Sequence, residues 1–103
     1  MRIIAVKTLK AFWQRHPDAQ TALRQWYNMT GQAEWANVAQ VRQTFGNADP
    51  VSVCHGNPVV VFNIGGNKYR LITAIHYNTQ VVYAMMVLTH KEYDKNKWKA
   101  QLC

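Results

Sequence analysis

The chain has 103 residues, a formal charge of +7 and a pI near 9.7. Apolar residues make up 49% of the sequence, which excludes a disordered chain, and two cysteines are too few for a disulfide-rich scaffold. No apolar run approaches the ~20 residues of a membrane-spanning helix, so we expect no membrane association. The composition therefore predicts one small cytoplasmic domain whose basic charge suits nucleic acid or an acidic protein partner.

The first half of the chain has the pattern of a short strand followed by helices. Apolar residues at positions 3, 4 and 6 indicate the strand, and helical spacing after Thr8 indicates the first helix, with Thr8 as its cap. Pro17 ends that helix, and Asp18 is the expected cap of the next one. Asn37 can cap a third, short helix, which Gly46 ends.

From residue 51 the periodicity becomes that of strands, in segments rich in Val, Ile and Tyr. Turn residues at 65–67 and 78–80 separate these segments, and strands joined so closely must be antiparallel. Thr89 and Glu92 then have the spacing of a capping box, at the start of a helix that runs to about Lys99. The sequence predicts a single α+β domain over residues 1–103, with an antiparallel sheet formed by residues 51–53, 59–64, 68–77 and 81–88.

Arg70 and Lys68 carry the only formal charges of the apolar stretch 51–89. Strand alternation places both side chains on the same face of the sheet. A guanidinium inside an apolar sheet is costly unless it is paired or faces a wet groove, and it binds phosphate or carboxylate in a forked geometry. Arg70 therefore either faces a phosphate or forms an ion pair with an acid such as Asp94 or Glu92.

His90, Tyr93 and Asp94 lie at positions i, i+3 and i+4, so we expect them on one face of the C-terminal helix. An imidazole titrates near neutrality, and a phenol can donate or accept a proton, so the group is a candidate for acid–base chemistry. The structural alternative is a histidine that ends the strand and an aromatic ring packed on the sheet. No metal-ligand pattern such as CxxC or HExxH is present, so we expect no metal and no cofactor.

The segments FNIGGNKYRLI at residues 62–72 and THKEYDK at residues 89–95 together carry a family resemblance. With HPDAQTAL near the N-terminus and a segment that ends in GNAD at residues 46–49, the chain resembles the HigB-type toxins of type II toxin–antitoxin systems, in the RelE/ParE-like superfamily. The resemblance implies a small twisted antiparallel sheet packed against N-terminal helices. It also implies a basic concave active face between the sheet and the C-terminal helix.

The resemblance implies a ribosome-dependent mRNA endonuclease that works without a metal and uses the RNA 2′-hydroxyl as nucleophile. Its partners would be a HigA-like helix-turn-helix antitoxin, the ribosome and mRNA, and operator DNA indirectly through the antitoxin. The family's motif residues correspond here to Arg70, His90 and Tyr93 as catalytic groups, with His90 and Tyr93 sharing the acid and base roles in an order left open. The substrate-contacting positions would be Asn63, Asn67, Lys68, Lys91 and Lys95.

Two other classes of function are compatible with the sequence. A ParE-like toxin would act on DNA gyrase and would have no nuclease chemistry. A non-catalytic RNA- or ribosome-binding module would use the lysines of the tail to contact phosphates, and its binding would be sensitive to salt. The lysines Lys91, Lys95, Lys97 and Lys99 are equally typical of a solvated helix face.

Overall fold

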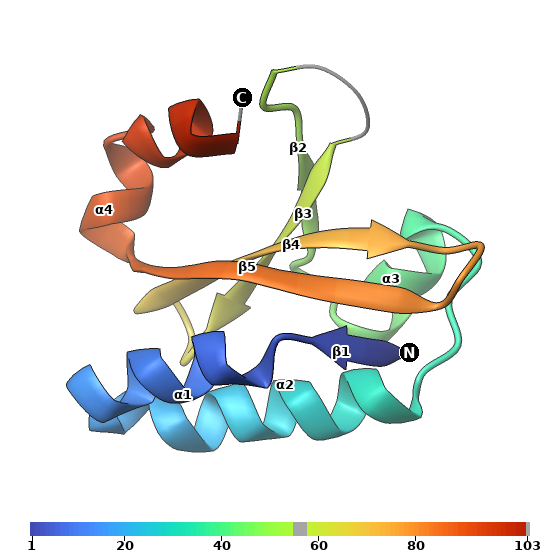
Figure 1. The fold of residues 1–103 in the computed structure, drawn as a ribbon, viewed down its shortest axis with the longest axis horizontal. Helices are drawn as coiled ribbons and strands as arrows, with labels where there is room; N and C mark the ends of the chain where they lie inside the picture. The colour runs from blue at the N-terminus through green and yellow to red at the C-terminus, as the bar shows by residue number, and fades with distance from the viewer. Residues whose placement is uncertain (55–57, 103) are drawn as a thin grey trace.

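A computed structural model describes residues 1–54 and 58–102 of the chain. The chain begins with a strand and a helical layer, and continues with a sheet that ends in two short helical segments (Figure 1). The elements are β1 (Arg2–Ile4), α1 (Val6–Arg15), the 3-10 turn η1 (Pro17–Ala19), α2 (Gln20–Gln32), α3 (Val38–Thr44), β2 (Asp49–Val51), β3 (Val59–Ile64), β4 (Tyr69–His76), β5 (Val81–Thr89), α4 (His90–Asp94) and the 3-10 segment η2 (Lys97–Leu102).

The five strands form one sheet in the order β1-β5-β4-β3-β2. The pairs β2–β3, β3–β4 and β4–β5 are antiparallel, which confirms the predicted meander. Strand β1 pairs with β5 in parallel, so the sheet is mixed, because the long helical crossover lets the first strand return in the same direction as the last. The strand predicted at 51–53 lies at Asp49–Val51 instead; it is an edge strand, where Pro50 need not donate a hydrogen bond to the sheet.

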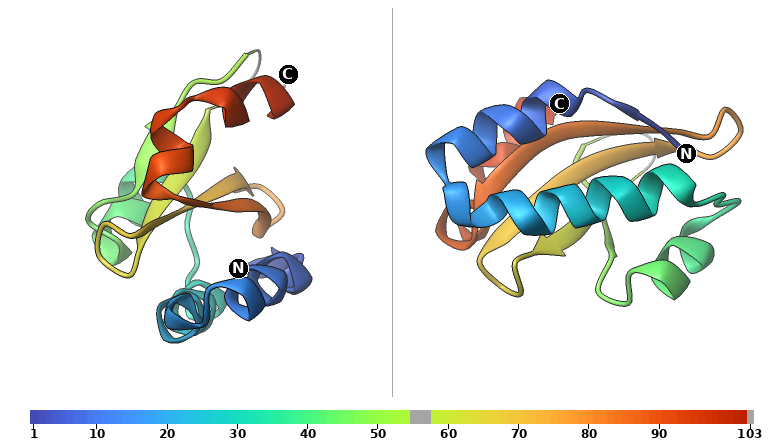
Figure 2. Two further views of the ribbon diagram at one scale, coloured as in Figure 1. Left: turned by 90° about the vertical axis from the view of Figure 1, so that its left-hand side faces the viewer. Right: turned by 90° about the horizontal axis from the view of Figure 1, so that it is seen from below.

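Two layers cover the two faces of the sheet. Helices α1 and α2 pack side by side against one face, and the α4–η2 segment lies over the other (Figure 2). Because side chains alternate along a strand, successive residues of β3 pack against different layers. Phe62 packs toward Trp26 of α2, whereas Val61 packs toward Trp98 of η2. The α4–η2 segment thus has its own small core, formed by Val59, Val61, Ile72 and Trp98.

The caps of α3 and α4 were predicted correctly. The side chain of Asn37 accepts a hydrogen bond from the Gln40 backbone N–H at 3.1 Å. Thr89 and Glu92 form a complete capping box at the start of α4, with distances of 3.0 and 3.2 Å. The sequence therefore determines where α4 begins, and that position matters because His90 and Tyr93 lie within this one helix.

Other helix boundaries differ from the prediction. The cap of α1 is Ala5 and not Thr8, and Asp18 caps no helix, because its carboxylate accepts a hydrogen bond from the Tyr69 hydroxyl at 2.6 Å. The expected continuous C-terminal helix breaks at Asn96, which adopts a left-handed backbone with φ of 61° and lets the chain turn into η2.

Among residues 1–54 and 58–102, no helix is long and apolar enough to cross a membrane. Cys54 is disulfide-bonded.

Candidate functional site

A cavity of about 360 Å³ lies on the face of the sheet that carries the α4–η2 segment. Its lining comes from five separate elements, α3, β2, β3, β4 and α4, together with the loop between α3 and β2. The lining residues are Arg42, Asn47, Ala48, Asp49, Val61, Asn63, Arg70 and Tyr93. Three of the residues predicted from the sequence, Asn63, Arg70 and Tyr93, are therefore brought together.

Arg70 is positioned by its own turn and not by an acid. Its Nη1 group donates to the backbone oxygens of Asn67 and Tyr69, each at 3.1 Å. In the described part of the chain no carboxylate forms an ion pair with Arg70, so the predicted alternative of a pair with Asp94 or Glu92 is wrong. The Nε and Nη2 groups also have no recorded protein partner within that part, which leaves donors on the guanidinium for an anion.

The Tyr93 ring contacts two side chains, Trp98 and Arg70. Its ring lies 5.2 Å from the Trp98 ring at an interplanar angle of 17°, and the Arg70 Cζ atom lies 5.6 Å from its centroid. Burial raises the pKa of the Tyr93 phenol above its usual value, and the negative charge of Asp49 raises it further, against the opposing effect of Arg70. The phenol is therefore protonated at neutral pH, and Tyr93 lines the cavity with a group that can donate a hydrogen bond.

His90 lies at the first position of α4, outside the lining of this cavity. Its Nδ1 atom is 2.8 Å from an Asp94 carboxylate oxygen, and its backbone N–H donates to the Lys68 oxygen at 3.0 Å. A carboxylate that accepts from Nδ1–H leaves Nε2 as the free nitrogen of a neutral imidazole. The contact of His90 with Asp94 agrees with the shared helix face that their i, i+4 spacing predicts, whereas the Tyr93 ring contacts Trp98 and the Arg70 guanidinium.

The predicted position of Lys68 beside Arg70 is wrong. Strand β4 begins only at Tyr69, so strand alternation does not extend to Lys68, which lies in the preceding turn. Its Nζ atom is 3.5 Å from a carboxylate oxygen of Asp18 in η1, and its side chain does not line the cavity. Asn67 contributes its backbone oxygen to Arg70. Lys91 on α4 and Lys95 just after this helix are exposed and likewise lie outside the lining.

Sequence reasoning missed three polar residues of the site, Arg42, Asn47 and Asp49. They come from the end of α3 and the segment that follows it, far from Arg70 in the sequence. The only signal was the GNAD segment at residues 46–49, which contributed to the family resemblance but suggested no role for its members.

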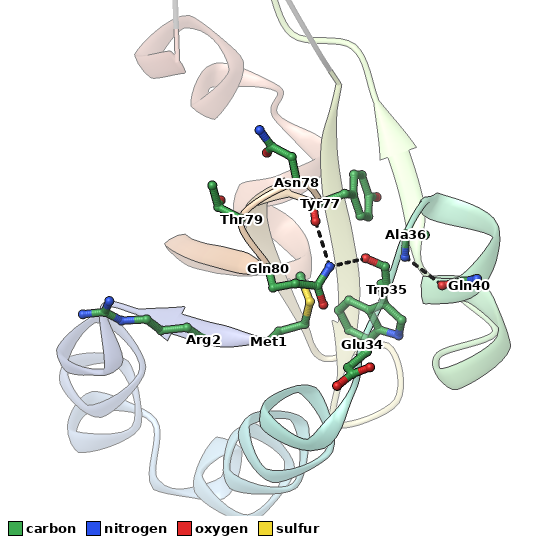
Figure 3. A pocket seen from close by; sticks show the side chains of 10 residues that line it. All are labelled: Met1, Arg2, Glu34, Trp35, Ala36, Gln40, Tyr77, Asn78, Thr79 and Gln80. Carbon is green, nitrogen blue, oxygen red and sulfur yellow. Dashed lines mark hydrogen bonds between the residues drawn. The ribbon is translucent and has the colours of Figure 1, made fainter.

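A second cavity, of about 1060 Å³, lies between the β4–β5 turn and the segment between α2 and α3 (Figure 3). Gln80 joins these two segments, because its Nε2 group donates to the backbone oxygens of Trp35 and Tyr77 at 2.6 and 2.8 Å. None of the predicted catalytic residues lines this cavity. In the part of the chain that the structure describes, no cluster of three His, Cys, Asp or Glu side chains could hold a metal ion.

Residues 19–96 match a family described as the RelE-like toxic component of a toxin–antitoxin system. The family is the HigB toxin family, and the chain belongs to it, which confirms the resemblance and implies an antitoxin partner. The chain is 29% identical over 94 residues to the mRNA interferase toxin HigB of Escherichia coli strain K12, covering 91% of this chain and 88% of the relative. It is 25% identical over 95 residues to the mRNA interferase HigB of Escherichia coli O6:H1, covering 92% and 90%.

Proposed function

We propose that this toxin is an endoribonuclease that cuts mRNA during translation, in the cytoplasm. The observation that carries the proposal is the pairing of Arg70 and Tyr93 in one open cavity. A guanidinium with free donors lies against a phenol that stays protonated at neutral pH. A guanidinium can stabilise charge on a phosphate, and a protonated phenol can supply the proton for a leaving oxygen. Relatives that align over nine-tenths of the chain are named mRNA interferases.

In this mechanism Arg70 binds the scissile phosphate and stabilises the charge that develops on its oxygens. The Nε2 atom of His90 accepts the proton of the RNA 2′-hydroxyl, with Asp94 orienting the ring through Nδ1. The 2′-oxygen bonds to phosphorus, and the bond from phosphorus to the 5′-oxygen breaks. Tyr93 donates its proton to that leaving oxygen, so the products are a 2′,3′-cyclic phosphate and a 5′-hydroxyl. The raised pKa of Tyr93 keeps its phenol protonated at neutral pH, so Tyr93 holds a proton to donate and the role of base is left to His90.

In this proposal the ribosome holds the RNA in position, because the toxin site does not enclose it. His90 is exposed and lies outside the lining of the cavity, so a bound RNA must be held by the ribosome to present one phosphate to Arg70, Tyr93 and His90 together. The lysines of α4 and the following turn are exposed, and they can contact ribosomal or messenger phosphates: Lys91, Lys95 and Lys97. We infer that the antitoxin is a HigA-like helix-turn-helix protein, which would connect the toxin to operator DNA.

The test is primer extension on mRNA from cells that express the wild type or an Arg70→Ala variant. Loss of one preorganised charge stabiliser typically lowers a rate by about 10²–10³, so Arg70→Ala should abolish cleavage and growth arrest. Tyr93→Phe, which keeps the stacked ring, should lower cleavage by about 10²–10⁴ through loss of the proton alone. Arg24→Ala, an exposed arginine of α2, is the matched control for the loss of one positive charge.

Cleavage by a folded Arg70→Ala variant at the wild-type rate would contradict the proposal. Efficient cleavage of free RNA without ribosomes would contradict the proposed dependence on the ribosome. Inhibition of gyrase supercoiling, or salt-sensitive RNA binding with no cleaved product, would replace it with one of the two alternatives.

A further inference from the structure

One wall of the site consists of polar side chains that have no hydrogen-bond or ion-pair partner in the described part of the chain. They extend from the end of α3 to β3: Arg42, Asn47, Asp49 and Asn63. We call these four residues the polar wall. Among residues 1–54 and 58–102, none of their side chains has a recorded hydrogen bond or ion pair. Hydrogen-bonding capacity that the fold itself does not use is available to a ligand.

The register of the sheet places Asp49 beside the phosphate-binding groups. Asp49 lies opposite Val61, and Asn63, two residues further along β3, lies opposite Arg70. Residues directly opposite each other, and residues two apart on one strand, share a face of the sheet. Asp49 therefore lies on the face that carries Arg70, and its charge reaches the Tyr93 phenol.

A carboxylate is unexpected in a site that binds phosphate, because it repels the anion. Among the described residues Asp49 is the one acid that lines the cavity, and Arg42 and Arg70 line it as well. The two arginines keep the cavity positive, so the phosphate can bind next to Asp49 without lying against it. A carboxylate accepts hydrogen bonds and donates none, so its ligand must be the part of the RNA that donates, and phosphates have no donors.

We propose that Asp49 binds the Watson–Crick edge of a guanine adjacent to the phosphate held by Arg70. This inference rests on the proposed endoribonuclease function and adds a base preference to it. Guanine is the one RNA base with two neighbouring donors on that edge, N1–H and the N2 amino group, which match the two oxygens of a carboxylate. Adenine and cytosine place an acceptor nitrogen beside their amino group, and uracil flanks its single N–H with two carbonyls. Each of these arrangements repels a carboxylate oxygen.

The other residues of the polar wall can form hydrogen bonds with the same guanine. The guanidinium of Arg42 can donate to the guanine O6 and N7 atoms, which is a common specific contact of arginine with this base. The amides of Asn47 and Asn63 can donate to the remaining acceptors of the base or its ribose. Single-stranded RNA exposes these edges, so an unpaired message in a cavity can be read in this way.

The experiment maps the 5′ ends of cleaved mRNA in cells that express the wild type or Asp49→Asn. An asparagine presents one acceptor and one donor, which match the neighbouring donor and acceptor of adenine or cytosine. At the two guanine donors that Asp49 accepts, the asparagine places its own amino donor against one of them. A good bidentate contact discriminates against the wrong base by roughly 5- to 150-fold. We expect wild-type cuts to be enriched at guanine, and Asp49→Asn to lose that enrichment by a factor in this range, with new cuts beside adenine or cytosine.

Two further variants sharpen the comparison. Asp49→Ala should lose the guanine enrichment and gain no new preference, because it removes both oxygens without adding a donor. Glu34→Gln removes the same charge from an exposed residue outside this cavity and should leave the pattern of cut sites as it is in the wild type. Asp49 is exposed on an edge strand, so circular dichroism should show both Asp49 variants folded.

An unchanged base distribution for Asp49→Asn would overturn the inference and leave the proposed function intact. Wild-type cuts without guanine enrichment would do the same. A folded Asp49→Asn variant that cuts at no base, as expected of Arg70→Ala, would also overturn it by placing Asp49 in the chemistry. A wild type that leaves mRNA intact would instead remove the proposed function, and this inference with it.

Discussion

Trp98 connects the stability of the C-terminal segment to the geometry of the site. Its ring is 3% exposed and packs on Val59, Val61 and Ile72 of the sheet. The same ring stacks on Tyr93, and its Nε1 group donates to the Tyr93 backbone oxygen at 3.1 Å. A Trp98→Ala variant would therefore lose the anchor of the α4–η2 segment and the support of the Tyr93 ring in one step.

The size of the effect follows from these contacts. Burial of roughly 200 Å² of ring at ~25 cal/mol per Å² is worth about 5 kcal/mol. Because alanine retains part of this burial, we expect the free energy of unfolding to fall by about 3–5 kcal/mol, the usual range for this substitution. That loss is a large part of the ~5–15 kcal/mol of a whole domain. Trp98→Phe keeps a stacked ring and loses the hydrogen bond, so it should cost less and keep most of the cleavage.

The assay is urea unfolding followed by far-UV circular dichroism, together with mRNA cleavage at a temperature where each variant is folded. Trp13→Ala is the matched control, because Trp13 packs partly buried in the layer of α1 and α2, on the opposite face of the sheet. The Trp13→Ala variant should have a lower free energy of unfolding, but its folded fraction should cleave mRNA as the wild type does. An unfolding free energy of Trp98→Ala within about 1 kcal/mol of the wild type would refute the reasoning. Wild-type cleavage by the folded variant would refute the positioning of Tyr93 by this ring.

Two other predictions concern single contacts. Thr89→Ala removes half of the capping box of α4 and should lower the free energy of unfolding by about 0.5–2 kcal/mol in the same urea assay. An unchanged free energy of unfolding would show that the cap does not stabilise α4. The hydrogen bond from Tyr69 lowers the pKa of Asp18 below its usual 3.8, so its stabilising effect is present above that pH and is lost as the pH falls through the lowered pKa. The difference in Tm between the wild type and Asp18→Asn, measured from pH 7 to pH 2, should therefore shrink at the acidic end; a difference independent of pH would contradict this.

Much of the fold could be predicted because it depends on short stretches of sequence. Strand alternation located β3, β4 and β5, and local capping chemistry located the starts of α3 and α4. The same alternation placed Arg70 on the face opposite Tyr69, where it meets the Tyr93 ring. It failed for Lys68, which lies one residue before the strand.

The sequence by itself predicted the fold class, the antiparallel meander, the family and three residues that line the cavity, Asn63, Arg70 and Tyr93. Each of these depends on residues a few positions apart, whose spacing is visible in the chain. Only the tertiary structure decided that Asp18 pairs with Lys68. It alone also showed that Arg42, Asn47 and Asp49 line the cavity. The reason is that the pairing of β2 with β3 and the position of α3 bring distant segments together, and the energy of such contacts comes from packing across the sheet, which no local pattern records.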